Sequence, residues 1–219
     1  MAEPSRELII CDFDGTISAI DTINYLCTRY TPDVFDELEG RLIGGDLTLE
    51  EVLRREIIAL RERVDDLPAI AAREVPLREG FAEFVGWVDE AGHELVIVSS
   101  GFRQLIEPML AAAGHDGITL VANDVDLAAG SGGVSFREGP TCTSCGQRCK
   151  RHDVASLRAD RHPSTPVTFI GDGFSDLCGC READRILAVG NLAGWLQRDG
   201  VPHHPFEDFH DVIALLQGA

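Results

Sequence analysis

Short apolar runs that end abruptly in acidic or hydroxyl residues and glycine limit what this chain can fold into. The first run, Leu8–Cys11, is followed by Asp12 and Asp14, with Phe13 between them. Continuous apolar runs of this length fill the central strands of parallel sheets, which are covered on both faces. Because side chains alternate along an extended chain, the two carboxylates can point to the same side. Gly15 then favours a sharp turn away from the strand.

Two later runs repeat this arrangement. Residues 95–98 lead into the hydroxyls and glycine of residues 99–101, and residues 167–170 lead into the acidic segment 171–176. Open α/β sheets bind their ligands beyond the carboxyl ends of their strands, so we expect these polar groups to meet at one edge. The sequence therefore predicts an α/β fold with a doubly wound, Rossmann-like parallel sheet.

The side chains at these strand ends suit phosphoryl transfer assisted by a divalent cation. Asp12, Asp14 and Asp172 offer the hard oxygen ligands that Mg²⁺ prefers, and Asp176 is expected to support them without touching the ion. Crowded carboxylates suppress each other's ionisation unless a cation is present. With Mg²⁺ bound, Asp12 can stay ionised and attack phosphorus to form an aspartyl phosphate. Asp14 can protonate the leaving oxygen and then activate water.

The single lysine of the chain lies between the second and third of these strand ends. Among the 19 basic residues, Lys150 alone is a lysine. A lysine at a helix start is by default a solvated side chain, but its place in this order favours phosphate binding. Together with the hydroxyl of Ser99, its ammonium can hold phosphoryl oxygens while charge redistributes. Ser100 and Gly101 are the adjacent substrate-binding candidates.

The order of these elements resembles the four motifs of the haloacid dehalogenase superfamily of phosphohydrolases. That resemblance implies that Asp12 is the nucleophile and Asp14 the acid and base. In the family, the backbone carbonyl of the second aspartate usually reaches the metal. The C-terminal part is most similar to methionine-salvage phosphatases that act on a methylthio-diketopentyl phosphate, with phosphoserine and phosphocholine/phosphoethanolamine phosphatases as related branches. The residues that carry this similarity are Cys145, Cys149, Lys150 and residues 170–173, 175–176, 181–184 and 205–209.

Residues 17–76 separate the first two motifs and have the pattern of helices. Residues 50–63 follow the N-cap candidate Thr48 and carry one apolar stripe, formed by Val52, Leu53, Ile57 and Leu60. The family resemblance implies that residues 17–76 are a small inserted helical cap domain and that residues 1–16 and 77–219 form the core domain. Such a cap closes over the site, excludes water and selects the substrate.

Asp21 lies at the expected start of the first helix of this segment. In the phosphoserine phosphatase branch, an acid at this position binds the amino group of the substrate. Asp21 is therefore a substrate-binding candidate, for an amino group or a hydroxyl. An ordinary N-cap role for its carboxylate suits the sequence equally well.

Several other activities are disfavoured by particular residues. The acid at Asp14 argues against hydrolytic dehalogenases and transport ATPases, and the absence of a lysine other than Lys150 excludes a Schiff base on a cap lysine. The predicted activity is thus a Mg²⁺-dependent phosphatase. Two alternatives stay open: a phosphomutase that retains the aspartyl phosphate, and a non-catalytic interaction module that depends on metal or thiols.

Charge and hydropathy define the expected partners. The net charge of −18 disfavours nucleic acid and anionic membranes. No run approaches the roughly 20 apolar residues that span a bilayer, and the polar residues 1–7 lack a signal-peptide pattern. We therefore expect a cytoplasmic protein that binds a small phosphorylated metabolite. A homodimer stays open, because a cap face and a dimer face have similar patterns.

Three cysteines precede Lys150 at short spacing. Cys142, Cys145 and Cys149 are candidate ligands of a structural Zn²⁺, with His152 or one of Cys178 and Cys180 as the fourth ligand. A turn that merely places Lys150 explains the same residues. A disulfide would require an oxidising compartment, which nothing else in the sequence indicates.

Overall fold

The strands of the computed structural model, which describes residues 6–128 and 133–218, form one sheet. Seven strands of the described part lie in the order β4-β3-β2-β1-β5-β6-β7, and only the edge pair β3 and β4 is antiparallel. The predicted α/β class with a doubly wound sheet is confirmed. The strands are β1 (Leu8–Cys11), β2 (Glu94–Phe102), β3 (Thr119–Val125), β4 (Val134–Ser135), β5 (Val167–Gly171), β6 (Arg185–Ala188) and β7 (His204–Pro205).

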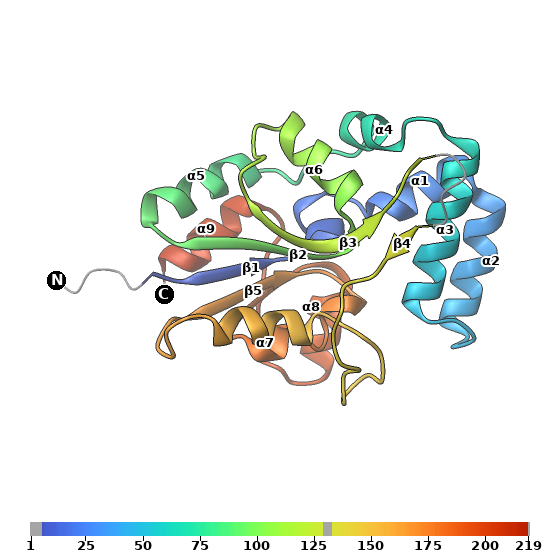
Figure 1. The fold of residues 1–219 in the computed structure, drawn as a ribbon. Coiled ribbons are helices and arrows are strands. Elements are labelled where there is room, and N and C mark those ends of the chain that lie inside the picture. Colours follow the sequence, from blue (N-terminus) through green and yellow to red (C-terminus); the bar gives the residue numbers. More distant parts are fainter. Residues whose placement is uncertain (1–5, 129–132, 219) are drawn as a thin grey trace.

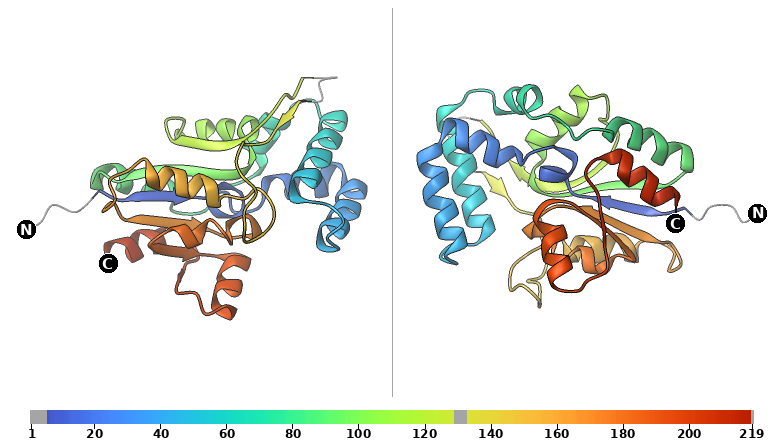
Figure 2. Two further views of the ribbon diagram at one scale, coloured as in Figure 1. Left: turned by 60° about the horizontal axis from the view of Figure 1, so that its bottom comes forward. Right: turned by 180° about the vertical axis from the view of Figure 1, so that it is seen from behind.

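Helices cover both faces of this sheet (Figures 1 and 2). On one face, Ile9 and Cys11 pack with the side chains of α5, α6 and α9; on the other, Leu8 and Ile10 pack with those of α7 and α8. No helix within residues 6–128 and 133–218 is both long and apolar enough to cross a membrane. The helices are α1 (Thr22–Tyr30), α2 (Pro32–Ile43), α3 (Leu49–Arg63), α4 (Leu67–Glu74), α5 (Phe81–Ala91), α6 (Arg103–Ala112), α7 (Arg151–Ala159), α8 (Gly190–Arg198) and α9 (Phe209–Gln217).

The register of the central strands aligns the three strand ends that the sequence marked. Cys11 of β1 is level with Ile97 of β2 and with Ile170 of β5. All four residues of β1 are buried, as expected of a strand between two helical layers. The residues that follow the aligned positions therefore emerge together at the carboxyl edge of the sheet.

Helices α1 to α3 lie beyond that edge, at the opposite end of the molecule from both termini (Figures 1 and 2). The expected helix N-cap at Thr48 is present at the start of α3. The Thr48 hydroxyl accepts a hydrogen bond from the Glu51 amide at 3.3 Å, and the Glu51 carboxylate accepts one from the Thr48 amide at 2.8 Å. This reciprocal pair satisfies amides that the first turn of α3 leaves free.

The packing of α4 ties this helical segment to the core. Helix α4 lies against α6, and one hydrophobic cluster runs from Ile9 in the sheet through Ile57 in α3 to Ala71 in α4. A separate small cluster joins α2 and α3 through Leu38 and Val52. The division into a 17–76 cap and a 1–16 and 77–219 core stays a prediction, and its two parts share buried surface.

Candidate active site

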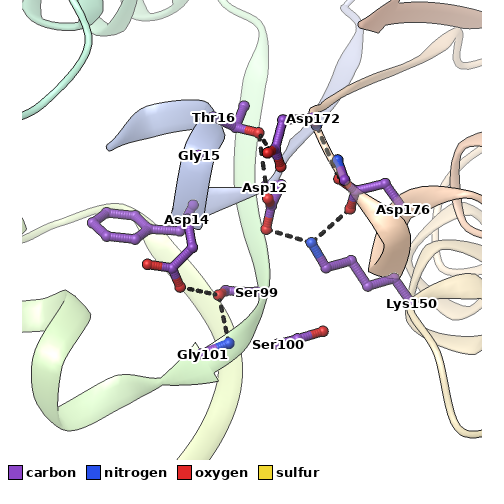
Figure 3. Close-up of polar contacts among 12 residues, drawn as sticks. Asp12, Asp14, Gly15, Thr16, Ser99, Ser100, Gly101, Lys150, Asp172 and Asp176 are labelled. Carbon is purple, nitrogen blue, oxygen red and sulfur yellow. Dashed lines mark hydrogen bonds and ion pairs between the residues drawn. The ribbon is translucent and has the colours of Figure 1, made fainter. Parts of the chain in front are cut away.

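The predicted catalytic residues converge at the carboxyl edge of the sheet (Figure 3). Asp12 and Asp14 follow β1, Ser99 lies in the last part of β2, and Asp172 follows β5. Backbone angles at Asp12 and Asp14 are both extended, and both residues line the same cavity. Lys150 joins them from the residue just before α7. The structure thus brings together groups that lie up to 160 residues apart in sequence (12 to 172).

Lys150 is fully buried and bridges two carboxylates. Its ammonium donates to Asp12 Oδ1 and, at 2.7 Å, to Asp176 Oδ1. The other oxygen of Asp176 accepts from the amides of Asp172 at 3.0 Å and Gly173 at 3.1 Å. Burial alone lowers the pKa of Lys150, but the two carboxylates outweigh it and the pKa is raised, so the ammonium stays charged.

The carboxylates beside this lysine form a strong negative centre. Oxygen atoms of Asp12, Asp172 and Asp176 lie within 4.8 Å of one another. Burial, reinforced by Asp176, raises the pKa of Asp12 to about 7; burial, reinforced by Asp12, raises that of Asp172 to about 8. One ammonium does not compensate three close carboxylates, so the donor set fits a hard divalent cation.

Asp14 faces a different part of the site. Its Oδ1 accepts from the Thr22 amide at 3.0 Å, and its Oδ2 accepts from the Ser99 hydroxyl at 3.5 Å. Its side chain lies outside the metal-suited group, which leaves it free for proton transfer. Burial, followed by the charge of Asp21, raises the pKa of Asp14 to about 6, in the range suited to an acid and base near neutrality.

The turn after β1 depends on Gly15 and on an arginine that the sequence did not single out. Gly15 adopts φ +76°, and a Cβ there would collide with the Asp172 carboxylate. Arg78 donates to the carbonyls of Gly15 at 2.6 Å and Thr16 at 2.8 Å. Thr16 in turn donates to Asp12 at 3.3 Å and to Asp172 at 3.4 Å. Nothing in the sequence distinguishes Arg78 from the other arginines.

Comparison with known proteins places this geometry in a family. A model of the haloacid dehalogenase-like hydrolases matches residues 9–181. The chain belongs to that family. Two 2-hydroxy-3-keto-5-methylthiopentenyl-1-phosphate phosphatases, from Brevibacillus brevis and Geobacillus thermodenitrificans, are each 31% identical to it. The alignments cover 97% and 96% of this chain and 96% and 95% of those proteins.

Solved phosphoserine phosphatases share the fold of this hydrolase. One, determined as a phospho-aspartyl intermediate analogue, has a TM-score of 0.69 at 18% identity. Another, determined with bound substrate, has a TM-score of 0.71 at 17% identity. Both matches cover 97% of this chain and 99% of the other. The predicted superfamily is thus confirmed, with methylthiopentenyl-phosphate phosphatases as relatives in sequence and phosphoserine phosphatases as neighbours in fold.

The cavity of this hydrolase has an acidic floor and an apolar roof. It measures about 150 Å³, and the catalytic candidates on its floor are joined by the predicted substrate-binding residues Ser100 and Gly101. Asp21 also lines it, while its carboxylate accepts from the Asn24 amide at 2.8 Å, so the N-cap role is confirmed. The roof is formed by Ile23, Leu49 and Leu53.

The predicted cysteine group lies beside this cavity and gains one member. Sulfur atoms of Cys142, Cys145, Cys149 and Cys178 lie within 4.8 Å of one another. Of the fourth ligands that the sequence left open, Cys178 is therefore the one brought to the three others. His152 and Cys180 are outside the group.

Proposed function

We propose that this chain is a Mg²⁺-dependent phosphatase that works through a phosphorylated Asp12 on a small ester with an apolar tail. The family and the phosphatase relatives make it a phosphoric monoester hydrolase. The metal, the covalent route and the substrate are our proposal. The observation that carries it is the buried Asp12 carboxylate, held by Lys150 and Thr16 at the edge of a cavity that Asp14 also lines.

The residues that would hold Mg²⁺ are Asp12, Asp172 and the backbone carbonyl of Asp14. The raised pKa values of Asp12 and Asp172 support this, because both carboxylates lack sufficient positive charge around them. Bound Mg²⁺ would supply charge neutralisation for these carboxylates and for the incoming phosphoryl group. Asp176 would hold Lys150 and the turn at Asp172, because both of its oxygens are already engaged there.

The first half-reaction needs a nucleophile and an acid. An oxygen of Asp12 attacks phosphorus, the bond between phosphorus and the ester oxygen breaks, and Asp14 gives its proton to that oxygen. In the second half, Asp14 accepts a proton from water as the water oxygen attacks phosphorus. Inorganic phosphate leaves and the Asp12 carboxylate is restored. The different hydrogen-bond partners of Asp12 and Asp14 suit these two roles.

Ser99 and Lys150 would stabilise the phosphoryl group during both steps. The Ser99 hydroxyl is fixed by the Gly101 amide, which donates to it at 2.9 Å, and it lines the cavity next to Asp14. Lys150 lies behind Asp12, so it orients the nucleophile and offsets charge that gathers on the transferred group.

The roof of the cavity favours an apolar substrate tail. Its residues Ile23, Leu49 and Leu53 offer no charge, and no arginine or lysine of the described chain lines this cavity. Phosphoserine carries a carboxylate that would need a cation there. A 2-hydroxy-3-keto-5-methylthiopentenyl phosphate instead has an apolar methylthio end, and its hydroxyl could donate to Asp21. We therefore place the substrate in the class named for the Brevibacillus and Geobacillus relatives.

The test is phosphate release from 2-hydroxy-3-keto-5-methylthiopentenyl-1-phosphate, phosphoserine and a hexose phosphate, with and without Mg²⁺. We expect Mg²⁺-dependent release that favours the first ester and falls at least about 10⁴-fold in Asp12→Asn. Asp116→Asn, an exposed site away from the cavity, is the matched control. An isomer instead of phosphate would indicate a phosphomutase. Full activity in Asp12→Asn would refute the covalent route.

A further inference from the structure

A second metal-suited group lies beside the active site and differs from it in chemistry. Three of its cysteines lie on the loop between β4 and α7, which projects from the body of the molecule (Figure 1). The fourth, Cys178, follows the turn after β5. Their sulfur atoms lie within 4.8 Å of one another. Four thiolates around one Zn²⁺ have Zn–S distances of about 2.3 Å and therefore lie about 3.8 Å apart, close to this arrangement.

We propose that Cys142, Cys145, Cys149 and Cys178 bind one structural Zn²⁺ ion. Four sulfur ligands from two chain segments make a closed tetrahedral set, and soft thiolates select zinc over magnesium. Binding releases the thiol protons to solvent as the four zinc–sulfur bonds form. The metal site is independent of the phosphatase proposal.

The backbone around the first two cysteines is already folded for such a site. Cys142 donates its amide to Gln147 O at 2.9 Å, and Gly146 donates to Cys142 O at 2.9 Å. Gly146 closes the turn with φ +70°, a conformation that favours glycine. The Ser144 amide points at Cys142 Sγ, 3.4 Å away, and such a bond stabilises a thiolate.

The connectivity gives this ion a positioning role in the active site. Cys149 immediately precedes Lys150, and Cys178 comes two residues after Asp176, the partner of that lysine. Zinc would therefore join the two segments from which the buried ion pair is built. On the other side of Cys149, Arg148 pairs with Glu50 of α3 at 2.5 Å. This positioning role rests on the proposed function, because it assumes that Lys150 is catalytic.

Metal analysis tests the site directly. Protein purified without chelators, and reduced protein reloaded with ZnCl₂, should each contain one zinc per chain by plasma mass spectrometry. Serine at any of the four positions should lower that content at least about tenfold, because a ligand is lost. Cys180→Ser is the matched control. Cys180 lies two residues from Cys178, is buried, and its thiol donates a hydrogen bond to the Leu177 carbonyl oxygen. Its zinc content should not change.

Cobalt substitution keeps the proposal falsifiable if a serine variant fails to fold. Wild-type protein loaded with Co²⁺ should show the absorption bands of tetrahedral cobalt with thiolate charge transfer. A reduced wild-type protein that binds neither Zn²⁺ nor Co²⁺ would overturn the proposal. So would a Cys178→Ser variant with full zinc content, or a purified protein in which mass spectrometry finds these cysteines joined as disulfides.

Kinetics separate the positioning role from the catalytic proposal. If zinc positions Lys150, Cys178→Ser should lower kcat about 10- to 100-fold with little change in KM, since a small displacement of a catalytic group has effects of that size. An unchanged kcat in the zinc-free variant would refute the positioning role and leave the metal site standing. Asp12→Asn should abolish turnover with full zinc content, so failure of one proposal is visible without the other.

Discussion

The floor and the roof of the cavity differ in how the chain builds them. Floor residues such as Asp12, Ser99 and Asp172 follow or end parallel strands, where sheet register fixes their positions. Roof residues Leu49 and Leu53 lie on α3, a helix placed by packing against other helices. We therefore expect the chemistry of this hydrolase to depend on the sheet edge and its selectivity to depend on a helical surface that can change separately.

The largest effect is expected where the floor loses its cation. In Lys150→Met, Asp12 and Asp176 remain buried without their shared ammonium, which we expect to cost about 3–5 kcal/mol of unfolding free energy at neutral pH. We also expect kcat to fall about 10²- to 10³-fold. Denaturant unfolding and phosphate release at saturating substrate measure the two effects.

The control for this variant lies on α7, the helix that follows Lys150. Arg158→Met removes a partly exposed cation that pairs with Asp184, and we expect it to change stability by less than about 1 kcal/mol. If the Lys150→Met enzyme matched the Arg158→Met enzyme in stability and rate, the buried lysine would contribute no more than an ordinary surface cation, and its proposed catalytic role would be wrong.

The same difference explains how much the sequence could predict. The strands 8–11, 95–98 and 167–170 and the convergence of their polar ends followed from apolar runs and from the rule that parallel strands end at one edge. Lys150 was found because it is the only lysine. These signals lie within short stretches of sequence, and parallel strand pairing then aligns the stretches at one edge of the sheet.

The roof could not be predicted in this way, because an apolar stripe on a helix does not specify which other elements it will pack against. The stripe on α3 reads as one face, yet Val52 packs with Leu38, Ile57 joins the main core, and Leu53 lines the cavity. Arg78 was missed for a related reason, and Cys178 could be named only as one of three candidates for the fourth ligand of the cysteine group. The role of each depends on a segment brought close only by the folded chain.

A charge in the roof tests whether selectivity is separate from chemistry. Leu53→Arg places a cation where we expect the methylthio tail, so kcat/KM for the methylthiopentenyl ester should fall about 10-fold or more. Relative activity on phosphoserine should rise, because the arginine can pair with its carboxylate. Leu53→Met conserves volume and should keep the original preference. An equal loss on both esters would mean that Leu53 supports the floor instead.

A buried acid in the middle of α3 gives a smaller effect, which should appear in the pH dependence of stability. Glu56 is 1% exposed, and its Oε1 has no hydrogen-bond partner among the described residues. Burial, reinforced by Glu39, raises its pKa from 4.5 to about 8. The folded state therefore holds a proton that the unfolded state releases, so stability present below about pH 4.5 is lost as pH rises towards 8.

Glu56→Gln should remove this pH dependence. At pH 8 the variant should be more stable than wild type by roughly 1–3 kcal/mol, and near pH 5 most of that advantage should be gone. Thermal or denaturant unfolding across this pH range measures it, with Glu62→Gln on the exposed side of the same helix as control. A constant difference at every pH would show that Glu56 is not the group that titrates.

The smallest effect on stability is expected where α3 contacts the loop between β4 and α7, which carries Cys142, Cys145 and Cys149. Glu50 of α3 pairs with Arg148, but both side chains are partly exposed, so Glu50→Gln should cost about 0.5 kcal/mol of stability or less. If the pair holds α3 over the cavity, KM should rise while kcat stays near its original value, since the floor is untouched. Added salt should weaken the pair in wild type and so reduce the difference between the two proteins. A fall in kcat without a change in KM would instead mean that α3 acts through Arg148 on Lys150, and roof and floor would then be one unit.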